Sequence, residues 1–152
     1  MTDQLVINEL LMSGFLLPWL HFLAIGALAM VLFGEWVTLR GRIEGPRLAV
    51  LLRMDFAYML LAGLVLATGA ARAMLGDKPG AYYVGNPVFH AKLGLFVLIG
   101  LISIVPTLSF FRWRKAGGAD EVAVAQTRRW VTAELLLLPL LPLCGAVLAR
   151  GW

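Results

Sequence analysis

The stretch of sequence that decides the fold is Asn86-Pro87-Val88-Phe89-His90-Ala91-Lys92-Leu93. It opens an apolar run that continues to Phe111. Pro87 suits the first turn of a helix, because the N–H that it lacks has no partner there, and Asn86 before it is a favourable N-cap. His90 and Lys92 then enter a segment that should lie in lipid, where an ionisable side chain costs free energy. Each therefore needs a partner, a wet cavity or a ligand.

The composition of the whole chain is that of a membrane protein. Of its 152 residues, 61% are hydrophobic and only 14% are charged, whereas soluble domains average about 25% charged residues. A helix needs about 20 apolar residues to cross a bilayer. We therefore predict an all-α fold, an integral membrane up-and-down four-helix bundle in a single domain, residues 1–152. The predicted spans cover about 12–38, 47–75, 87–113 and 122–149.

The distribution of positive charge predicts how the bundle is oriented. Loops one and three share a side in an up-and-down bundle, and their edges carry Arg40, Arg42, Arg47, Arg112, Arg114, Lys115, Arg128 and Arg129. The opposite side holds only Arg72, Lys78 and Arg150. Cytoplasmic loops are rich in Lys and Arg, so we expect both loops in the cytoplasm and both termini on the outer side. The same rule explains the net charge of +4 without a nucleic-acid partner.

This orientation places one set of ionisable residues in the outer half of the bundle. His21, His90 and Lys92 lie there, with Arg72 at the rim. One interpretation is a cofactor or substrate site, in which His21 and His90 are metal ligands and Lys92 or Arg72 pairs with an anion. The alternative is that both imidazoles only hydrogen-bond between helices, while Lys92 extends to the headgroups.

His90 and Lys92 cannot both point into the same core. They are two residues apart on one helix, so about 200° separates their directions. Depth favours Lys92, because it lies level with His21 at about 1.5 Å of rise per residue. Chemistry favours His90, because imidazole is the commoner iron ligand. We expect Lys92 to face the cavity and His90 to lie nearer the outer interface.

A second set of ionisable residues, Glu35, Arg53, Asp55 and Glu134, falls in the inner half and is expected to form a buried polar network. Arg53 can pair with Glu134 or Glu35. Asp55 can pair with Arg128 or Arg129. Acids and bases in matching number favour a structural ion network. The alternative is a proton path, since ionisable groups inside a membrane often form one.

Several short motifs resemble known membrane proteins. Trp19-Leu20-His21-Phe22-Leu23-Ala24 resembles the Leu-His start of the first span in HemJ-type protoporphyrinogen oxidases. Phe89-His90-Ala91-Lys92-Leu93 resembles their Trp-Leu-His-x-Lys-Leu element, and Arg129, Glu134 and Pro139 resemble their late Arg…Glu…Pro stretch. CopD-like copper-resistance membrane domains are wider relatives. The order of Tyr82-Tyr83, Asn86-Pro87, Lys92-Leu93, Pro106-Thr107 and Arg112-Trp113 is similar to a domain-of-unknown-function family of small four-span bacterial proteins.

The resemblance implies a four-helix protein of the bacterial inner (cell) membrane that binds haem b. His21 and Lys92 are the matching functional positions, and His90 matches as well, although Val88 stands where the HemJ element has Trp. The expected function is then a haem-b-associated membrane redox protein. An oxidoreductase similar to the porphyrinogen oxidases is its specific form.

The expected partners of such a protein are the lipid bilayer and a porphyrin or quinone-like electron partner. Its small size and glycine-rich helices are also compatible with a homo-oligomer. The alternatives are a membrane protein that handles copper or protons through the same polar residues, and an accessory or structural membrane protein without catalysis.

Overall fold

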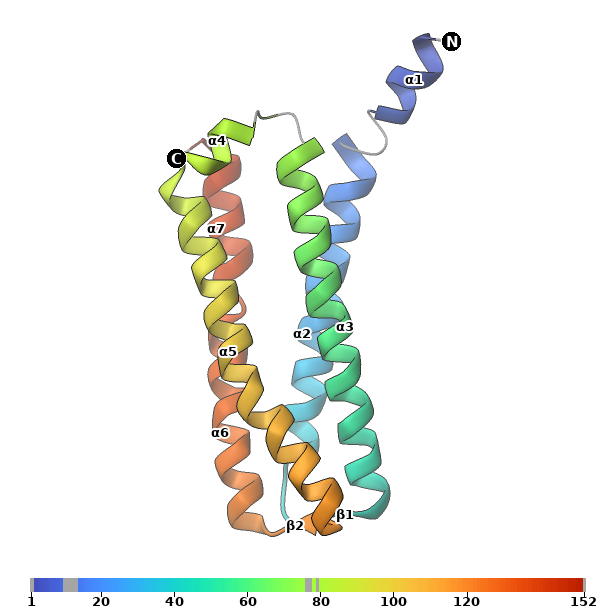
Figure 1. Ribbon diagram of the computed structural model, residues 1–152, viewed down its shortest axis with the longest axis vertical. Helices are drawn as coiled ribbons and strands as arrows, with labels where there is room; N and C mark the ends of the chain where they lie inside the picture. Colours follow the sequence, from blue (N-terminus) through green and yellow to red (C-terminus); the bar gives the residue numbers. More distant parts are fainter. Residues whose placement is uncertain (1, 10–13, 76–77, 79, 152) are drawn as a thin grey trace.

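The computed structural model describes residues 2–9, 14–75, 78 and 80–151. Its elements, in chain order, are α1 (Thr2–Glu9), α2 (Leu17–Thr38), β1 (Ile43–Glu44), α3 (Gly45–Leu75), α4 (Gly80–Val84), α5 (Pro87–Ala116), β2 (Gly118–Ala119), α6 (Glu121–Leu137) and α7 (Leu140–Ala149). Among the described residues, four helical segments are long and apolar enough to cross a membrane, and they contain α2, α3, α5 and the α6–α7 pair. They lie side by side along the long axis (Figure 1). The predicted all-α membrane bundle is confirmed.

The ends of α5 follow from its local sequence. The Asn86 side chain caps the helix, because its Oδ1 accepts the N–H groups of Val88 at 2.8 Å and Phe89 at 3.4 Å. Pro87 occupies the first turn, as the sequence predicted. At the other end Gly117 adopts a left-handed φ of 83°, which a glycine reaches without steric cost.

The fourth span is broken where proline predicts a bend. α6 ends at Leu137 and α7 begins at Leu140, with Pro139 between them. Proline has no N–H to donate and its ring clashes with the preceding turn, so the regular helix is interrupted there. The predicted start of the first span, residue 12, lies outside the described residues.

A short β-ladder that the sequence did not predict closes one end of the bundle. Ile43 pairs with Ala119 and Glu44 pairs with Gly118, in antiparallel register. A side chain at Gly118 would put a Cβ 2.6 Å from the Ile43 carbonyl oxygen, so this position requires glycine. The ladder joins the loop after α2 to the loop after α5, and we call this the strand end (Figure 1). The opposite end, which carries α4 and the end of α7, is the terminal end.

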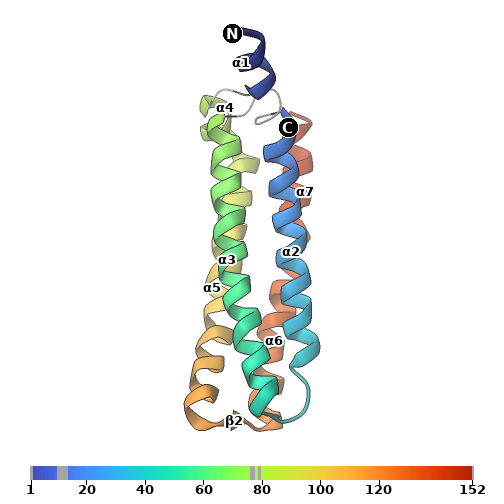
Figure 2. The same ribbon diagram turned by 90° about the vertical axis from the view of Figure 1, so that its right-hand side faces the viewer.

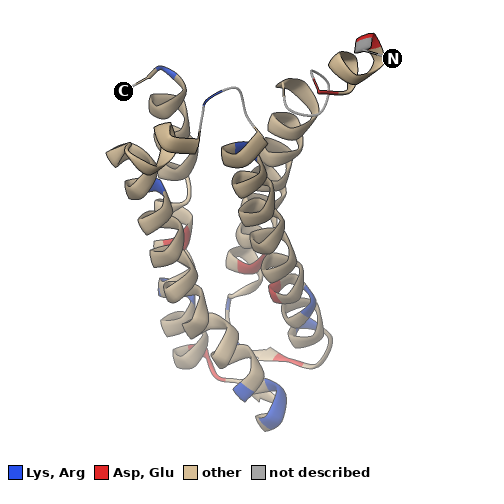
Figure 3. Cartoon of the chain, turned by 45° about the horizontal axis from the view of Figure 1, so that its top comes forward, with Lys and Arg blue, Asp and Glu red and all other residues tan. Residues whose placement is uncertain are grey.

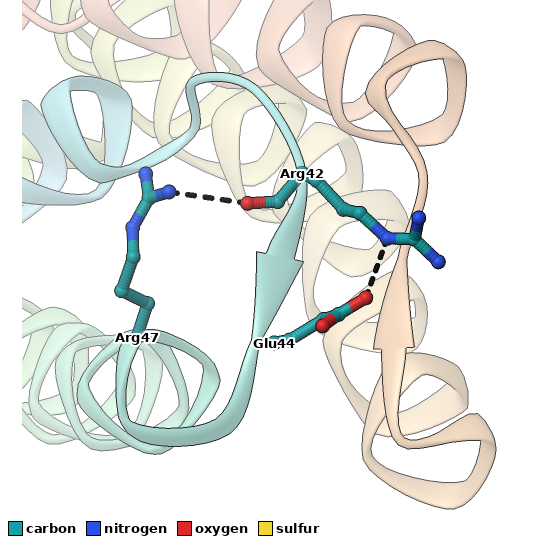
Figure 4. A network of polar contacts seen from close by, with 3 residues as sticks. All are labelled: Arg42, Glu44 and Arg47. Atoms are coloured by element: carbon teal, nitrogen blue, oxygen red, sulfur yellow. Dashed lines mark hydrogen bonds and ion pairs between the residues drawn. The ribbon is translucent and has the colours of Figure 1, made fainter.

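Arginine side chains stabilise the strand end through hydrogen bonds and an ion pair. Arg47 donates to the backbone carbonyls of Thr38 at 2.8 Å, Arg40 at 2.9 Å and Arg42 at 3.1 Å. Arg42 forms an ion pair with Glu44 at 2.5 Å (Figure 4). These contacts hold the turn before α3 in place. Lys and Arg residues also gather at this end in Figure 3.

Hydrogen bonds and a cation–π contact join α2 to α6 within the bundle. The indole N–H of Trp36 donates to Thr132 Oγ1 at 2.9 Å. The guanidinium of Arg128 lies 4.0 Å from the centre of the Trp36 ring and donates to the Trp36 carbonyl. α2 also packs along α3, while α5 packs against α6 and α7 (Figures 1 and 2).

The apolar residues are divided between the core and the outer surface. Leu28, Leu32 and Val131 are almost fully buried between the helices. Met30 and Leu136, in contrast, are 76% and 72% exposed in the isolated chain. Large apolar side chains on the outside of four spanning helices face lipid, so the bilayer is a partner of the protein.

Candidate functional site: a cavity beside His21

His21 is buried in α2 near the terminal end and is held by a threonine of α3. Its side chain is 3% exposed, and Nδ1 lies 2.8 Å from Thr68 Oγ1. The Thr68 hydroxyl lies 2.7 Å from the Leu64 carbonyl, to which it donates. With the hydroxyl hydrogen assigned to that carbonyl, we assign the hydroxyl oxygen as the acceptor and His21 Nδ1–H as the donor. In this tautomer Nε2 carries the lone pair.

The Nε2 atom of His21 is buried without a hydrogen-bond partner in the described part of the chain. An unsatisfied buried polar atom costs free energy, which a ligand would recover. The ring has room because α3 carries a glycine beside it. A Cβ at Gly69 would lie 3.2 Å from His21 Cε1 and 4.0 Å from Nε2. A histidine fixed through Nδ1–H with a free Nε2 is the arrangement of a metal-ligating imidazole.

His21 lines two adjoining cavities, of about 350 and 160 Å³, which we call together the His21 cavity. Both are lined by His21, Gly69, Phe89 and Lys92. The larger reaches the terminal end and is also lined by Arg72, Lys78, Tyr82, Tyr83 and Leu148. The smaller lies deeper and is mainly apolar, with Ile25, Val65, Phe96 and Leu141 in its walls. An elongated space with an apolar floor and a polar mouth suits an amphiphilic ligand.

The charged side chains in the walls of the His21 cavity are cations. Lys92, Arg72 and Lys78 line it, and none of the described lining residues is acidic. Lys92 Nζ would lie 3.4 Å from a Cβ at Gly145, so glycine leaves it space. Lys78 donates to the Leu148 carbonyl at 3.3 Å. The cations would attract an anionic group at the mouth.

His90 points away from this cavity. Its side chain is exposed, and Nε2 lies 2.7 Å from the Val84 carbonyl in the turn before α5. Lys92 lines the cavity. This is the arrangement that the sequence predicts, because the helical period separates the two side chains and depth favours Lys92 for the cavity. His21 and His90 are therefore not brought together, and no group of three His, Cys, Asp or Glu side chains in the described chain could hold a metal ion.

Nearer the strand end lies a second polar set, the carboxyl layer of Glu35, Asp55 and Glu134. These side chains are 2%, 3% and 1% exposed, respectively. Tyr58 donates its hydroxyl to Glu134 Oε2 at 2.9 Å, and Thr107 donates to Asp55 Oδ1 at 2.7 Å. Four helices, α2, α3, α5 and α6, thus contribute to one layer.

The expected pairing of acids with bases in this layer is not found. In the described part of the chain the one ion pair is that of Arg42 with Glu44. Arg53 is exposed, and Arg128 is engaged by Trp36. The reason is the helical period, because Arg53 stands two residues before Asp55 and therefore faces almost the opposite way. The buried network is acidic, and Arg53 is not part of it.

The sequence did not predict the hydroxyl groups that form hydrogen bonds with His21 and with the carboxyl layer. Thr68, Tyr58 and Thr107 all lie in apolar runs. Because they are uncharged, the sequence pattern does not distinguish them from other span residues. Tyr58 follows Asp55 by three residues, which puts both on one face of α3. That spacing is the signal that would have found it. Thr68 has no comparable signal, because its role depends on how closely α2 approaches α3.

Comparison with protein families gives a match over most of the chain. The model of a family described as predicted membrane protein (DUF2214) matches residues 13–152. No curated protein and no solved structure matches the chain.

Proposed function

The chain belongs to this DUF2214 family of predicted membrane proteins, and we propose that it is a haem-b-associated redox protein whose cofactor lies in the His21 cavity. The observation that carries the proposal is the state of His21. The ring is buried, its Nδ1–H is fixed by Thr68, and Nε2 is left without a partner beside a cavity. Such an imidazole would hold haem iron through Nε2.

The other walls of the cavity fit the remaining parts of the same ligand. Haem has an apolar ring and two anionic propionates. The ring would occupy both parts of the His21 cavity, with its apolar edge toward the floor, and Lys92 and Arg72 would pair with the propionates. Haem would supply one-electron chemistry, and the protein would bind and orient it and keep water away from its apolar face.

The resemblance of the His21 and Lys92 motifs to HemJ-type enzymes supports the same proposal. In its specific form the protein is an oxidoreductase similar to the porphyrinogen oxidases, with a porphyrin or quinone-like electron partner. A CopD-like role would use the same histidine for copper. The two histidines lie apart, which favours haem over a copper site built on both.

We further propose that the strand end faces the cytoplasm of a bacterial inner membrane. Arg47, Arg42 and Arg40 gather there with the basic end of α5, which carries Arg114 and Lys115. This is the bias of cytoplasmic loops. Reporter fusions after Gly117 and after Trp152 should report the cytoplasm and the outside, respectively. The reverse pattern would contradict the proposed orientation.

An absorption spectrum and a metal analysis of the purified protein test the function directly. The protein should be expressed with haem available and purified in mild detergent. A Soret band with a haem b difference spectrum, at up to one haem per chain, would support the proposal. Bound copper without haem would favour the copper-handling alternative, and the absence of both would favour an accessory protein.

A further inference from the structure

The carboxyl layer has no part in holding haem, yet it is too costly to be incidental. Glu35, Asp55 and Glu134 come from three different helices and meet inside the bundle. Glu35 lies within electrostatic reach of both other acids. Its Oε1 is buried without a hydrogen-bond partner in the described part of the chain. An oxygen placed in this way has room for one more donor, which a proton or a water molecule would supply.

The groups that face the carboxyl layer do not balance its charge. α3 contributes the hydroxyl of Tyr58, and α5 contributes those of Thr107 and Ser103. On α6 the basic side chains before Glu134 are Arg128, which is bound to Trp36, and Arg129, which is exposed. Carboxylates crowded together in a dry interior without cations cannot all be ionised. Protons are the cations that remain to neutralise them.

A third cavity lies beside Tyr58 and shares two wall residues with the His21 cavity. It has a volume of about 170 Å³ and is lined by Tyr58, Ser103, Phe96 and Leu141, among others. Phe96 and Leu141 also line the apolar floor of the His21 cavity. A water molecule needs only about 10–15 Å³ of such space together with polar partners, and the two hydroxyls provide them. Tyr58 therefore stands between the carboxyl layer and the cavity.

We propose that Glu35, Asp55 and Glu134 form a proton-binding site that exchanges protons with the His21 cavity through the Tyr58 hydroxyl. In the exchange step, Tyr58 passes its hydroxyl proton to the carboxylate of Glu134, along the hydrogen bond of 2.9 Å. The Tyr58 oxygen takes a proton from a protonated water (H₃O⁺) in the third cavity, which is left as neutral water. The tyrosine is unchanged, one proton has moved, and the reverse sequence releases it. No haem is needed for this step.

Infrared spectroscopy of the protein in lipid vesicles tests the site, whatever its haem content. At neutral pH the wild-type protein should show the carbonyl band of protonated carboxyl groups, and the band should shift in D₂O. The isosteric variants Glu35→Gln, Asp55→Asn and Glu134→Gln should each lose part of it. Glu121→Gln, at the exposed start of α6, is the matched control and should leave it unchanged. A wild-type protein without the band would overturn the proposal, and this measurement needs no variant.

The rate of the D₂O shift tests the connection to the His21 cavity. Tyr58→Phe removes the hydroxyl and keeps the ring, so it should slow the shift at least tenfold without removing the band. Thr107→Val removes a hydroxyl from the same layer but away from the third cavity, and it should leave the rate within twofold. An unchanged rate in Tyr58→Phe would overturn the exchange route. A wild-type band that never shifts would show a sealed structural cluster instead of an exchanging site.

Discussion

The two buried polar regions meet the cost of burial in different ways. Around His21, cations and an imidazole nitrogen without a hydrogen-bond partner in the described part of the chain line a cavity, as the proposed ligand would require. In the carboxyl layer Glu134 and Asp55 accept hydrogen bonds from hydroxyl groups, and a proton would satisfy the Glu35 oxygen that has no partner in the described part of the chain. A buried polar group beside a cavity indicates binding, whereas one enclosed by donors indicates internal charge balance. The following variants test that distinction.

The largest effect is expected for His21→Ala. It removes the proposed axial ligand, so haem should be lost from the purified protein. Glu134→Gln is the control from the carboxyl layer, and it should keep the wild-type haem content. Haem per chain, measured from the absorption spectrum, checks both. A difference spectrum of wild-type size in His21→Ala would remove His21 from the site.

Thr68→Val should weaken haem binding without abolishing it. The change keeps the shape of the side chain but leaves His21 Nδ1 without the partner at 2.8 Å. Loss of the residue that hydrogen-bonds to a metal-ligating histidine typically lowers metal affinity roughly 10- to 100-fold. Haem titration of the apoprotein measures the change. Thr132→Val, which removes the partner of Trp36, is the matched control, and an equal loss there would point to general destabilisation.

Replacing the cavity lysine should have a smaller effect. Lys92→Met keeps most of the length but loses the charge, and a hydrogen bond to a charged group contributes about 1.5–3 kcal/mol. Because Lys92 is only half-buried, the lower end of this range applies, and haem affinity should fall by about tenfold. His90→Ala should have no effect, because His90 faces away from the cavity. Loss with His90→Ala and none with Lys92→Met would reverse the assignment of the two residues.

The smallest effect is expected in the carboxyl layer. Thr107→Val removes the hydrogen bond of 2.7 Å to Asp55 and should lower the free energy of unfolding by about 1 kcal/mol. Haem affinity should not change. Denaturant unfolding in detergent measures the first quantity, and haem titration measures the second. A loss of haem as large as that in Thr68→Val would mean that the two regions are not separate.

The sequence predicts the fold well because each span is long, apolar and punctuated. Asn86 and Pro87 mark the start of α5, and Pro139 marks the break in the last span. The β-ladder at the strand end was not predicted, because two-residue strands carry no periodic pattern. Its glycine, Gly118, is required by a contact with Ile43, which is distant in sequence.

The two sites were predictable to different degrees. Depth and helical period were enough to favour Lys92 over His90 for the cavity. Arg53 and Asp55 are also two residues apart on one helix, so the same period places them on opposite faces. The predicted ion network included both residues and did not take this into account. The tautomer of His21 depends on Thr68, and contact between α2 and α3 cannot be derived from either helix alone.

The most direct test of the central claim, that His21 Nε2 holds the iron of haem b, is chemical rescue. His21→Gly empties the place of the ring while Thr68 and Gly69 remain around it. The account predicts that this variant lacks haem when it is purified alone. Added imidazole should then restore haem binding and the wild-type spectrum. Full haem content in His21→Gly without imidazole would contradict the claim.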